Sequence, residues 1–493
     1  MAAARPLVPV WAAQGLPALA SFPHYDRSRR ACSIAHLGVG NFHRAHQARF
    51  LDEYLQTHDE DWLMHGIGLL ETDRGLLQAM NVQDGLYTLT ERSGSRDTTR
   101  VIGSIKTCSH APADPQGVAA LLASSNIRII TLTITEKGYG YDAAGNLDLD
   151  HPAIRADLAP GATPQTALGY LFAAAARRMA THAPPVTIVS CDNLPGNGNM
   201  LARLLAQFAE RKDAAVGRWI RANISFPNCM VDRITPATTA ATLEYVRETF
   251  GIDDRCPVVS ESYLQWIVED RFVAGRPQLE SVGVQFVDDV APYEQLKVWL
   301  LNGSHSALAY PAYLLGYRAV DAAMRDPLLR TYVRRYMDED ITPALPAVPG
   351  IDVTAYKATL LERFSNPAIS DQVQRLAMDG SQKIRNAIVP PLEHQIGAGG
   401  SIKWIAFALA AWYRYLRGVD EGSAAIEIVD PRREALTARA TAGPDDPAPL
   451  LSMPEIFGLR IPGSSRVLAA VQDCVAAIDR LGTRRALAEL LAQ

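Results

Sequence analysis

The chain has 493 residues with ordinary apolar and charged fractions, a length that predicts two to three domains with large cores. Its net charge of −5 gives no reason to expect nucleic acid or an anionic membrane surface as a partner, and no apolar run approaches the ~20 residues of a membrane span. Prolines interrupt the alanine-rich N-terminal segment, so no signal peptide is expected and the cytoplasm is the default location.

A short buried strand at 33–37 leads directly into the glycine turn GVGNFH at 38–43. In dinucleotide-binding folds the first glycine permits the tight turn, and the second lets backbone amides approach the pyrophosphate at a helix N-terminus. His43 takes the place of the third glycine of G-x-G-x-x-G, so the pattern gains its weight from the strand before it and from the helix predicted up to about Thr57. The expected cofactor contacts are Gly38, Gly40, Asn41 and Phe42.

A second strand, 62–70, ends in the acidic turn Glu71-Thr72-Asp73. A carboxylate at this place accepts hydrogen bonds from the adenosine ribose hydroxyls and favours NAD over NADP. The separation from the glycines is longer than the usual ~20 residues. The choice between Glu71 and Asp73 therefore stays open, and a solvated loop after the strand is the alternative.

More strand-like runs follow, separated by alanine-rich helical segments, and this alternation predicts a doubly wound α/β sheet. In such sheets ligands bind beyond the carboxyl ends of the strands. Polar loops follow three of the strands, and Asn193 is their strongest candidate, because an amide beside the reacting carbon can donate to an alkoxide. A turn-forming asparagine is the alternative. The strands are expected at 127–135, 186–190, 224–226 and 258–260, and the loops at 135–139, 191–198 and 227–233.

The sheet-like pattern fades near Gln285, and long apolar helical segments follow, such as 403–416 and 465–491. We therefore expect a Rossmann-like dinucleotide-binding domain with an N-terminal extension over residues 1–290. Residues 291–493 are expected to form a mainly helical domain that binds the substrate and carries out catalysis.

The run YEQLKVWLLNGSHSALAY, 293–310, carries the most informative pattern of the chain. On a helix of 3.6 residues per turn, Asn302 and His305 are i,i+3 neighbours, and Lys297 lies about two turns before His305. Apolar neighbours would partly desolvate the lysine and lower its pKa, as a general base requires. The alternatives are a surface helix with a solvated lysine and a Tyr293-x-x-x-Lys297 pair of the short-chain dehydrogenase type, for which the chain is far longer than needed.

The cysteines and histidines show no metal-binding or disulfide pattern. The six cysteines lie far apart without a C-x-x-C pair. The histidines have no H-E-x-x-H or similar spacing, which disfavours a zinc-type alcohol dehydrogenase. We therefore expect no metal and assign activation of the substrate to protein side chains.

Four motifs in one order, GVGNFHRAH, SCDNLPGNG, FPNCMVDRITP and KVWLLNGSH, resemble the polyol-specific long-chain dehydrogenases, the mannitol 2-dehydrogenase family. The resemblance covers nearly the whole chain and continues through VPGIDVTAYK, RFSNPAISDQ and DGSQKIRN. It implies an N-terminal nucleotide-binding domain, a mostly helical C-terminal domain and a substrate between them. It also implies NAD or NADP as cofactor, no metal, and a chain that is often monomeric.

In that family the lysine of K-x4-N-x2-H is the catalytic base, which implies this role for Lys297. The resemblance further implies that Asn302 and His305 bind and polarise the reacting hydroxyl, and that Asn193 is the second amide that stabilises the alkoxide. The residues implied to contact the distal hydroxyls of the substrate are Asp232, Arg375 and Lys383.

The expected reaction is a metal-independent, NAD-dependent oxidation of an acyclic polyol to a ketose. Mannitol to fructose is the first choice, with D-arabinitol and sorbitol as close competitors. One alternative is a hexuronate reductase of the same family, in which Arg375 or Lys383 would bind the substrate carboxylate. Another is a non-catalytic dinucleotide-binding sensor, which the intact set of Lys297, Asn302 and His305 argues against.

Overall fold

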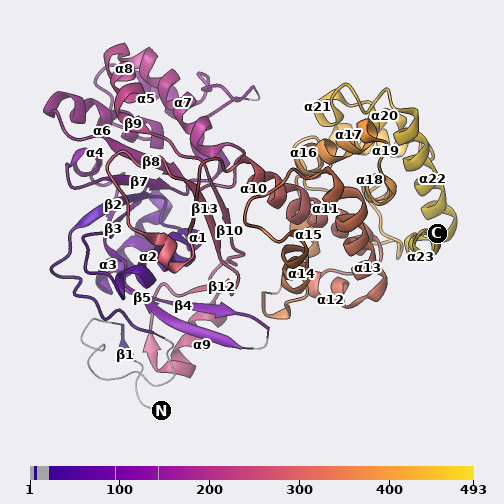
Figure 1. Ribbon diagram of the computed structural model, residues 1–493, viewed down its shortest axis with the longest axis horizontal. Helices are drawn as coiled ribbons and strands as arrows, with labels where there is room; N and C mark the ends of the chain where they lie inside the picture. The colour runs from indigo at the N-terminus through magenta and orange to yellow at the C-terminus, as the bar shows by residue number, and fades with distance from the viewer. Residues whose placement is uncertain (1–4, 8–20, 95, 143, 370) are drawn as a thin grey trace. The chain divides into compact units, whose positions relative to one another are not determined.

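The computed structural model describes residues 5–7, 21–94, 96–142, 144–369 and 371–493. Most of the N-terminal extension, on which the signal-peptide expectation rests, lies outside the described residues. The chain divides into two compact units, Met1–Ala291 and Pro292–Gln493. Strands gather in the first unit, and helices make up the second (Figure 1).

The first unit is built on a six-stranded parallel sheet with the order β6-β3-β2-β7-β8-β9. Counted along the chain this is the order 3-2-1-4-5-6 of dinucleotide-binding folds, in which the winding reverses between β2 and β7. The predicted doubly wound α/β fold is confirmed. The strands are β2 (Cys32–Leu37), β3 (Leu63–Gly68), β6 (Ile105–His110), β7 (Ile129–Leu132), β8 (Val186–Ser190) and β9 (Ile224–Ser225).

Both faces of the sheet are buried. In β7 the neighbouring side chains of Ile129 and Ile130 belong to two different hydrophobic clusters, as expected when alternate residues point to opposite faces. This double burial explains why the strands are nearly continuous apolar runs. The helices of this unit are α1 (Asn41–Ala45), α2 (Gln47–Leu55), α3 (Arg74–Val82), α4 (Pro115–Ala123), α5 (Pro152–Leu158), α6 (Ala167–Thr181), α7 (Asn197–Lys212), α8 (Ala214–Asn223) and α9 (Ala240–Phe250).

Smaller sheets accompany the large one. The strand expected at 258–260 is present as β12 (Val258–Glu261), but its assignment to the doubly wound sheet is wrong, because β12 pairs in parallel with β4. The apolar pattern of a strand indicates that the strand is buried, but it does not indicate which strand pairs with it. The other strands are β1 (Arg5–Pro6), β4 (Tyr87–Arg92), β5 (Asp97–Ile102), β10 (Cys229–Asp232), β11 (Ile252–Asp253), β13 (Gln265–Glu269) and β14 (Gln285–Val287).

The second unit is organised around α18 (Lys403–Tyr415), which packs against α11 (Gly303–Leu314) and α22 (Ser465–Leu481). The single helical segment expected over 465–491 is wrong, since Gly482, with φ +78°, separates α22 from α23 (Thr483–Ala492). The remaining α-helices are α10 (Ala291–Leu296, whose first residue belongs to the first unit), α12 (Val320–Arg325), α13 (Pro327–Arg335), α14 (Val353–Phe364), α15 (Val373–Ala377), α16 (Gly380–Ala387), α17 (Val389–Ala398), α19 (Arg433–Ala442), α20 (Ala448–Leu451) and α21 (Pro454–Phe457).

Short turns of other helical types complete both units. Two π-helices interrupt the α-helices in the described part of the second unit, and the first of them contains Lys297 and Asn302 of the lysine motif. The π-helices are η5 (Lys297–Asn302) and η6 (Tyr336–Ile341), and the 3-10 helices are η2 (Glu71–Asp73), η3 (Glu136–Tyr139), η4 (Leu279–Val282), η7 (Thr342–Ala344) and η8 (Pro367–Ile369).

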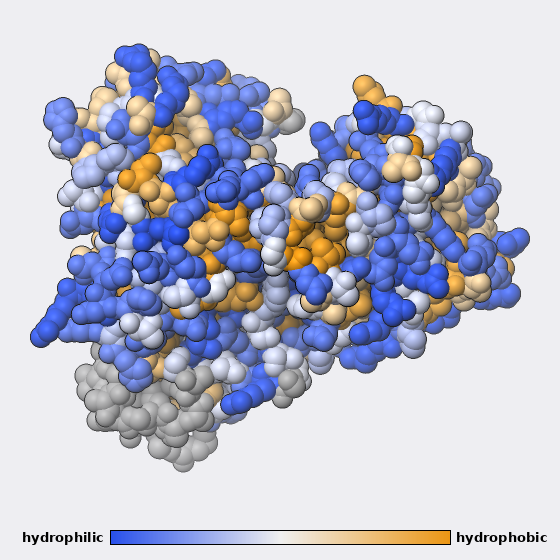
Figure 2. Space-filling view, viewed as in Figure 1, coloured by the Kyte–Doolittle hydropathy of each residue, from blue (hydrophilic) through white to orange (hydrophobic). Residues whose placement is uncertain are grey.

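Hydrophilic residues cover most of the face drawn in Figure 2, and hydrophobic residues reach it in smaller patches. Within the described part of the chain, no helix is long and apolar enough to cross a membrane. The large hydrophobic side chains found exposed there are Leu70, Val82, Leu149, Val273, Val419 and Leu459.

Candidate functional site

The glycine turn lies at the carboxyl end of β2, beside β3 and β7. Gly38 has φ +94°, and a Cβ there would lie 2.1 Å from the carbonyl oxygen of Thr133, so the turn requires glycine. Its N–H donates to the carbonyl of Ile67 at 2.8 Å. A Cβ built on Gly40 would meet no atom nearer than 4.0 Å, which leaves open space beside the first turn of α1. Space and backbone donors at this edge of the sheet fit the pyrophosphate of a dinucleotide.

His43, at the position of the missing third glycine, stacks on His36 with the ring centroids 3.3 Å apart. The His36 ring nitrogens lie 2.7 Å from the Thr131 hydroxyl and 3.1 Å from the Gly38 carbonyl. Burial lowers the pKa of His36 to about 3, and burial next to His36 holds the pKa of His43 well below its ordinary value. Both imidazoles are therefore neutral, and they pack as rings where a glycine would bring helix and strand together.

The Asn41 side chain is bonded within the protein. Its amide nitrogen donates to the carbonyl of Pro236 and to the hydroxyl of Thr238, each at 3.2 Å, and its oxygen accepts from Arg44 at 2.6 Å. We therefore assign any contact of Asn41 with a pyrophosphate to its backbone N–H. Phe42 is half-buried and stacks on His46 with the ring centroids 4.9 Å apart.

The two acids after β3 have different surroundings. Asp73 accepts a hydrogen bond from the Leu70 N–H at 2.9 Å, which closes its own turn. Glu71 has a side chain that is 66 % exposed, and it pairs with Arg74 at 2.6 Å. His110 lies 3.8 Å from the other oxygen of the Glu71 carboxylate. Of the two, Glu71 is the acid that extends into solvent.

Asp192, which sequence reasoning passed over, joins the loops that follow β7 and β8. Its carboxylate accepts from the backbone N–H groups of Ile134 at 3.0 Å and Thr135 at 2.8 Å, and from the Tyr139 hydroxyl at 2.6 Å. Thr135 has φ +62°, an uncommon conformation for a threonine, and the bond to Asp192 helps to hold it. Asn193 follows directly and is exposed. An acid at a strand end beside the candidate amide was the signal available in the sequence.

Asn197 brings the two remaining loops together. Its side-chain amide donates to the carbonyls of Asp192 at 3.0 Å and Cys229 at 2.8 Å, and its oxygen accepts from the Cys229 N–H at 3.0 Å. The loop that carries Asn193 is thereby tied to the start of β10, the strand that ends at the buried Asp232. Within the first unit, these bonds connect the loops of two predicted site residues.

Arg233, the residue after Asp232, is also a feature that sequence reasoning missed. It donates to the carbonyl of Ala45 at 2.5 Å and to the carbonyl of Glu261 at 2.8 and 3.0 Å, and its side chain is fully buried. Ala45 is the last residue of α1, so a cation lies at the carbonyl end of the helix that begins at the glycine turn. Arg233 thus links that helix to the end of β10.

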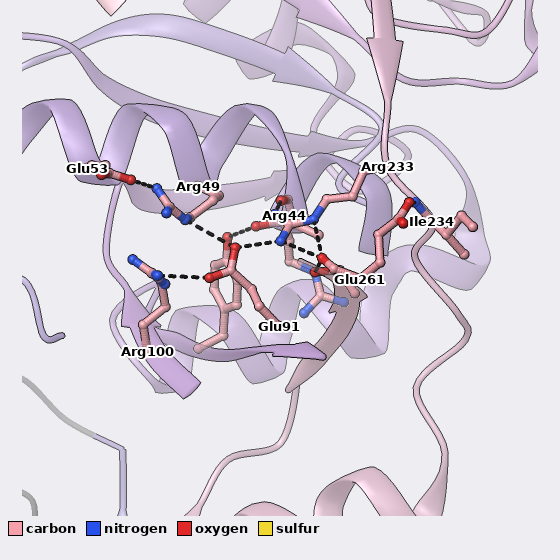
Figure 3. A network of polar contacts seen from close by, with 11 residues as sticks. Arg44, Arg49, Glu53, Glu91, Arg100, Arg233, Ile234 and Glu261 are labelled. Carbon is pink, nitrogen blue, oxygen red and sulfur yellow. Dashed lines mark hydrogen bonds and ion pairs between the residues drawn. The ribbon is translucent and has the colours of Figure 1, made fainter. Parts of the chain in front are cut away.

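Glu91 is the counter-charge of Arg233. Its carboxylate lies between the guanidinium groups of Arg49, Arg100 and Arg233 (Figure 3). The nitrogen–oxygen distances are 3.4, 2.8 and 2.5 Å. Burial opposes the ionisation of Glu91, but the three cations, Arg233 foremost, prevail and lower its pKa. The carboxylate is therefore ionised at neutral pH, and it supports the framework around α1.

In the second unit the lysine motif is helical, as expected, but the expected regular spacing of 3.6 residues per turn is wrong. The π-helix begins at Lys297 and ends at Asn302, and the Gly303 N–H donates to the carbonyl of Val298, five residues back. In an α-helix, side chains five positions apart point about 140° apart. In a π-helix they follow one another on one face. His305 comes three residues after Asn302 in α11, so all three motif residues share a face.

Lys297 is nearly buried, with 6 % of its surface exposed, while Asn302 and His305 are half-buried. The Tyr293 hydroxyl donates to the carbonyl of Pro349 at 2.9 Å and is engaged there. This bond favours a structural role for Tyr293 over the tyrosine–lysine pair considered above.

His305 lies close to two of the residues assigned to the distal hydroxyls. Burial, together with the positive charges of Arg375 and Lys383, lowers the pKa of His305 to about 3, against the opposing charge of Asp371. The ring packs on Phe364 with the centroids 4.6 Å apart. His305 is therefore a neutral imidazole that can donate one hydrogen bond and accept another.

Lys383 and Arg375 stand together beside His305. The Lys383 ammonium donates to the carbonyls of Arg375 at 3.1 Å and Leu376 at 3.0 Å, and burial is the main cause that lowers the pKa of Lys383 to about 8. Arg375 pairs with Asp371 through Nε at 2.6 Å. The second unit thus brings together Lys297, Asn302 and His305 on one helical face, and His305 with two cations. Across the described ranges, no three His, Cys, Asp or Glu side chains form a group that could hold a metal ion.

Comparison with known proteins agrees with this picture over both units. The family model of the mannitol dehydrogenase Rossmann domain matches residues 32–281, and that of the mannitol dehydrogenase C-terminal domain matches residues 289–479. The mannitol 2-dehydrogenase of Aspergillus fumigatus is 42% identical over 478 residues, which cover 95% of each chain. A Saccharomyces cerevisiae mannitol dehydrogenase is 42% identical over 476 residues, or 96% of this chain and 95% of that one.

Two solved structures are similar throughout. The ternary complex of Pseudomonas fluorescens mannitol 2-dehydrogenase with NAD and D-mannitol is 43% identical, with a TM-score of 0.86 over 99% of this chain and 100% of that chain. A D-sorbitol dehydrogenase in substrate-free form is 35% identical, with a TM-score of 0.91 over 98% of this chain and 100% of that chain.

A 3-2-1-4-5-6 parallel sheet with a glycine turn at its reversal point defines a Rossmann-type dinucleotide-binding protein. With both family models matched and relatives above 40% identity over almost the whole length, the chain belongs to the mannitol dehydrogenase family.

Proposed function

We propose that this chain oxidises a secondary hydroxyl of an acyclic polyol to a ketose, with NAD as the electron acceptor and without a metal ion. The observation that carries the proposal is the shared helical face of Lys297, Asn302 and His305. The relatives named mannitol 2-dehydrogenase and D-sorbitol dehydrogenase support the same substrate class.

In the proposed reaction Lys297 takes the proton of the reacting hydroxyl on its Nζ. The amides of Asn302 and Asn193 donate to the alkoxide oxygen as its charge develops, and each such bond is worth about 2.7–4 kcal/mol in comparable sites. The neutral imidazole of His305 orients the same oxygen. The role assigned to NAD is to accept the hydride that leaves the carbon, so that a C=O bond forms as the C–H bond breaks.

We assign the cofactor to the first unit. The glycine turn and the first turn of α1 would hold the pyrophosphate, and Glu71 would accept from the ribose hydroxyls. A carboxylate at this place repels the extra phosphate of NADP, which is why we choose NAD. The exposed side chain of Leu70 offers an apolar surface for the adenine.

We assign binding of the distal hydroxyls of the polyol to three polar side chains, those of Asp232, Arg375 and Lys383. Mannitol is the first choice of substrate because three of the relatives named above carry its name, and D-arabinitol and sorbitol are the close competitors. We propose a monomer, from the family resemblance, and keep the cytoplasm as its expected location.

The test is production of NADH by the purified, chelator-treated protein on mannitol, D-arabinitol, sorbitol and xylitol. Lys297→Met keeps the apolar stem of the lysine and removes the amine, so it should abolish turnover while the protein still binds NADH. Lys403→Met, at the start of α18, is the control for loss of a half-buried lysine and should keep turnover. Activity that needs added metal, or that survives in Lys297→Met, would contradict the proposed mechanism.

A hexuronate reductase is the second candidate, favoured by the two cations beside His305. Lys383 has a pKa of about 8, so it carries its charge below that pH and loses it above. If the substrate is a uronate, its KM should rise as the pH passes 8, and fructuronate should be reduced faster than fructose. Binding of NADH without turnover of any polyol or uronate would instead favour the sensor.

A further inference from the structure

We infer that Gly303 and Tyr336 are positioning residues for the reaction, acting through the π-helix that places Lys297 and Asn302 on one face; this rests on the proposed role of Lys297 as the base. The K-x4-N spacing suits a base and an alkoxide donor only when the turn between them has i→i+5 hydrogen bonds. With ordinary α-helical bonds the two side chains would diverge by about 140°. Whatever fixes the hydrogen-bond pattern of this turn therefore fixes the geometry of proton transfer.

Gly303 is the point at which the π-helix passes into α11. Its N–H is shared between the carbonyls of Leu300 and Val298, and the bond to Val298, five residues back, is the π-type bond that closes the turn. A Cβ on Gly303 would lie 2.7 Å from the Tyr336 hydroxyl oxygen and 3.2 Å from the carbonyl oxygen of Ala387. The first of these distances is impossible for a real side chain. The hydroxyl of Tyr336 thus occupies the place of the missing side chain, directly after Asn302.

Tyr336 cannot easily yield, because it is buried at 0 % exposure at the start of the second π-helix, η6. That segment is held by Asp340, whose carboxylate accepts from the backbone N–H groups of Trp404 and Ile405, each at 2.8 Å. Since these N–H groups belong to the first turn of α18, η6 is attached to the central helix of the unit.

The Tyr336 hydroxyl has no hydrogen-bond partner among the described residues. A buried hydroxyl without a partner costs stability, and its removal should be neutral or stabilising for the fold. The hydroxyl therefore contributes contact with Gly303 rather than a bond of its own. This combination makes the contact testable by paired substitutions.

The experiment compares Gly303→Ala, Tyr336→Phe and the double variant. In Gly303→Ala we expect kcat on the preferred polyol to fall about 10- to 100-fold, because a displacement near 1 Å misaligns base and substrate, while KM changes much less. Without the hydroxyl, the nearest atom of the ring to the new Cβ is Cε1 at 3.7 Å, an ordinary contact. The Ala387 carbonyl oxygen, at 3.2 Å, is then the one remaining tight contact, so the double variant should regain most of the kcat of Tyr336→Phe.

Gly380→Ala is the matched control. Gly380 is the first residue of α16, and a Cβ on it would lie 2.6 Å from the hydroxyl oxygen of Tyr310, a buried residue of α11, and 2.9 Å from Nε1 of Trp412. Because α16 carries Lys383, assigned to the distal hydroxyls, this variant should change KM more than kcat. An equal fall of kcat in Gly380→Ala and Gly303→Ala, or no recovery in the double variant, would overturn the inference.

If Gly303→Ala does not fold, the double variant still tests the inference. It is expected to fold and to turn over at a rate close to that of Tyr336→Phe. Crystal structures of the wild type and of the variants supply a readout that needs no turnover, namely the bond from the Gly303 N–H to the Val298 carbonyl. A wild type inactive on every polyol would refute the proposed function and leave that readout intact. An unchanged turn in Gly303→Ala would refute the positioning role whatever the activity.

Discussion

His305 has the chemistry of a hydrogen-bonding group, not of an acid. With a pKa of about 3 it stays neutral throughout the range in which a dehydrogenase is assayed, so it cannot supply a proton or a positive charge to the alkoxide. In the proposed reaction its contribution is one directed N–H, and the proton transfer is assigned to Lys297.

A pH profile tests this assignment. His305→Gln retains an N–H donor, so it should lower kcat but leave the limbs of the kcat–pH profile between pH 5 and 9 where the wild type has them. The reason is that the imidazole does not titrate in that range. Disappearance of an acidic limb in the variant would show that His305 titrates during turnover.

Glu71 and Asp73 can be separated by fragment binding. Glu71→Gln removes the charge that repels a 2′-phosphate and leaves Arg74 beside it, so we expect affinity for 2′,5′-ADP to rise about tenfold relative to 5′-AMP, or about 1.4 kcal/mol. Asp73→Asn disturbs only the turn that Asp73 closes. Isothermal titration measures both, and a larger shift in Asp73→Asn would assign the ribose to Asp73.

At the scale of elements, Glu91 and Arg233 hold the framework of the cofactor-binding edge. The helix is interrupted between α1 and α2, and two carbonyls at the end of α1 accept hydrogen bonds from buried side chains. Arg233 donates to the carbonyl of Ala45, and the Tyr87 hydroxyl donates to the carbonyl of Arg44 at 2.6 Å. These donors come from other elements, so the short helix is oriented by packing, not by its own length.

Loss of the Glu91 charge should be costly. Glu91→Gln would remove the carboxylate that the fully buried Arg233 shares with the partly buried Arg49 and Arg100, and we expect the free energy of unfolding to fall by about 3–5 kcal/mol. Glu53→Gln, which breaks the pair of Arg49 with a side chain that is 45% exposed, should cost below about 1 kcal/mol. Urea unfolding compares the two, and equal losses would mean that the network is not electrostatic in origin.

At the scale of the whole molecule, neutral histidines that are buried or half-buried should make the fold sensitive to acid. Their folded pKa values lie below the unfolded value of about 6.5, so between the two the unfolded chain binds more protons and stability falls as the pH falls. Each histidine contributes up to roughly 1.4 kcal/mol per pH unit below 6.5. Raised pKa values of three buried aspartates act in the opposite sense. The histidines are His36, His43, His65 and His305, and the aspartates are Asp52, Asp192 and Asp340.

A single substitution isolates one of these contributions. His65 has a pKa lowered by burial to about 4, so His65→Gln should lose less stability than the wild type between pH 6.5 and pH 4.5. The difference between the two urea-unfolding curves should therefore shrink or reverse toward pH 4.5. Parallel curves at every pH would contradict a neutral buried His65.

By itself, the sequence determined the fold class and the elements that carry the candidate site. The strand Val186–Ser190 was predictable to the residue, because a strand buried on both faces is a continuous run of apolar and β-branched residues. The glycine turn was equally predictable. Gly38 approaches the backbone of Thr133 too closely for any side chain, so this position requires glycine, and the glycine is visible in the sequence. Lys297, Asn302 and His305 were recognisable as a motif because their spacing is local.

Only the tertiary structure decided which distant segments meet. The pairing of β12 with β4, the bonds of Asp192, and the cation at the end of α1 join residues far apart in the chain, and no local pattern names such partners. The π-helix at Lys297–Asn302 belongs to the same class. The same letters are compatible with i→i+4 and i→i+5 bonds, and the choice between them depends on how tightly Gly303 packs against Tyr336, a contact that exists only once the chain has folded.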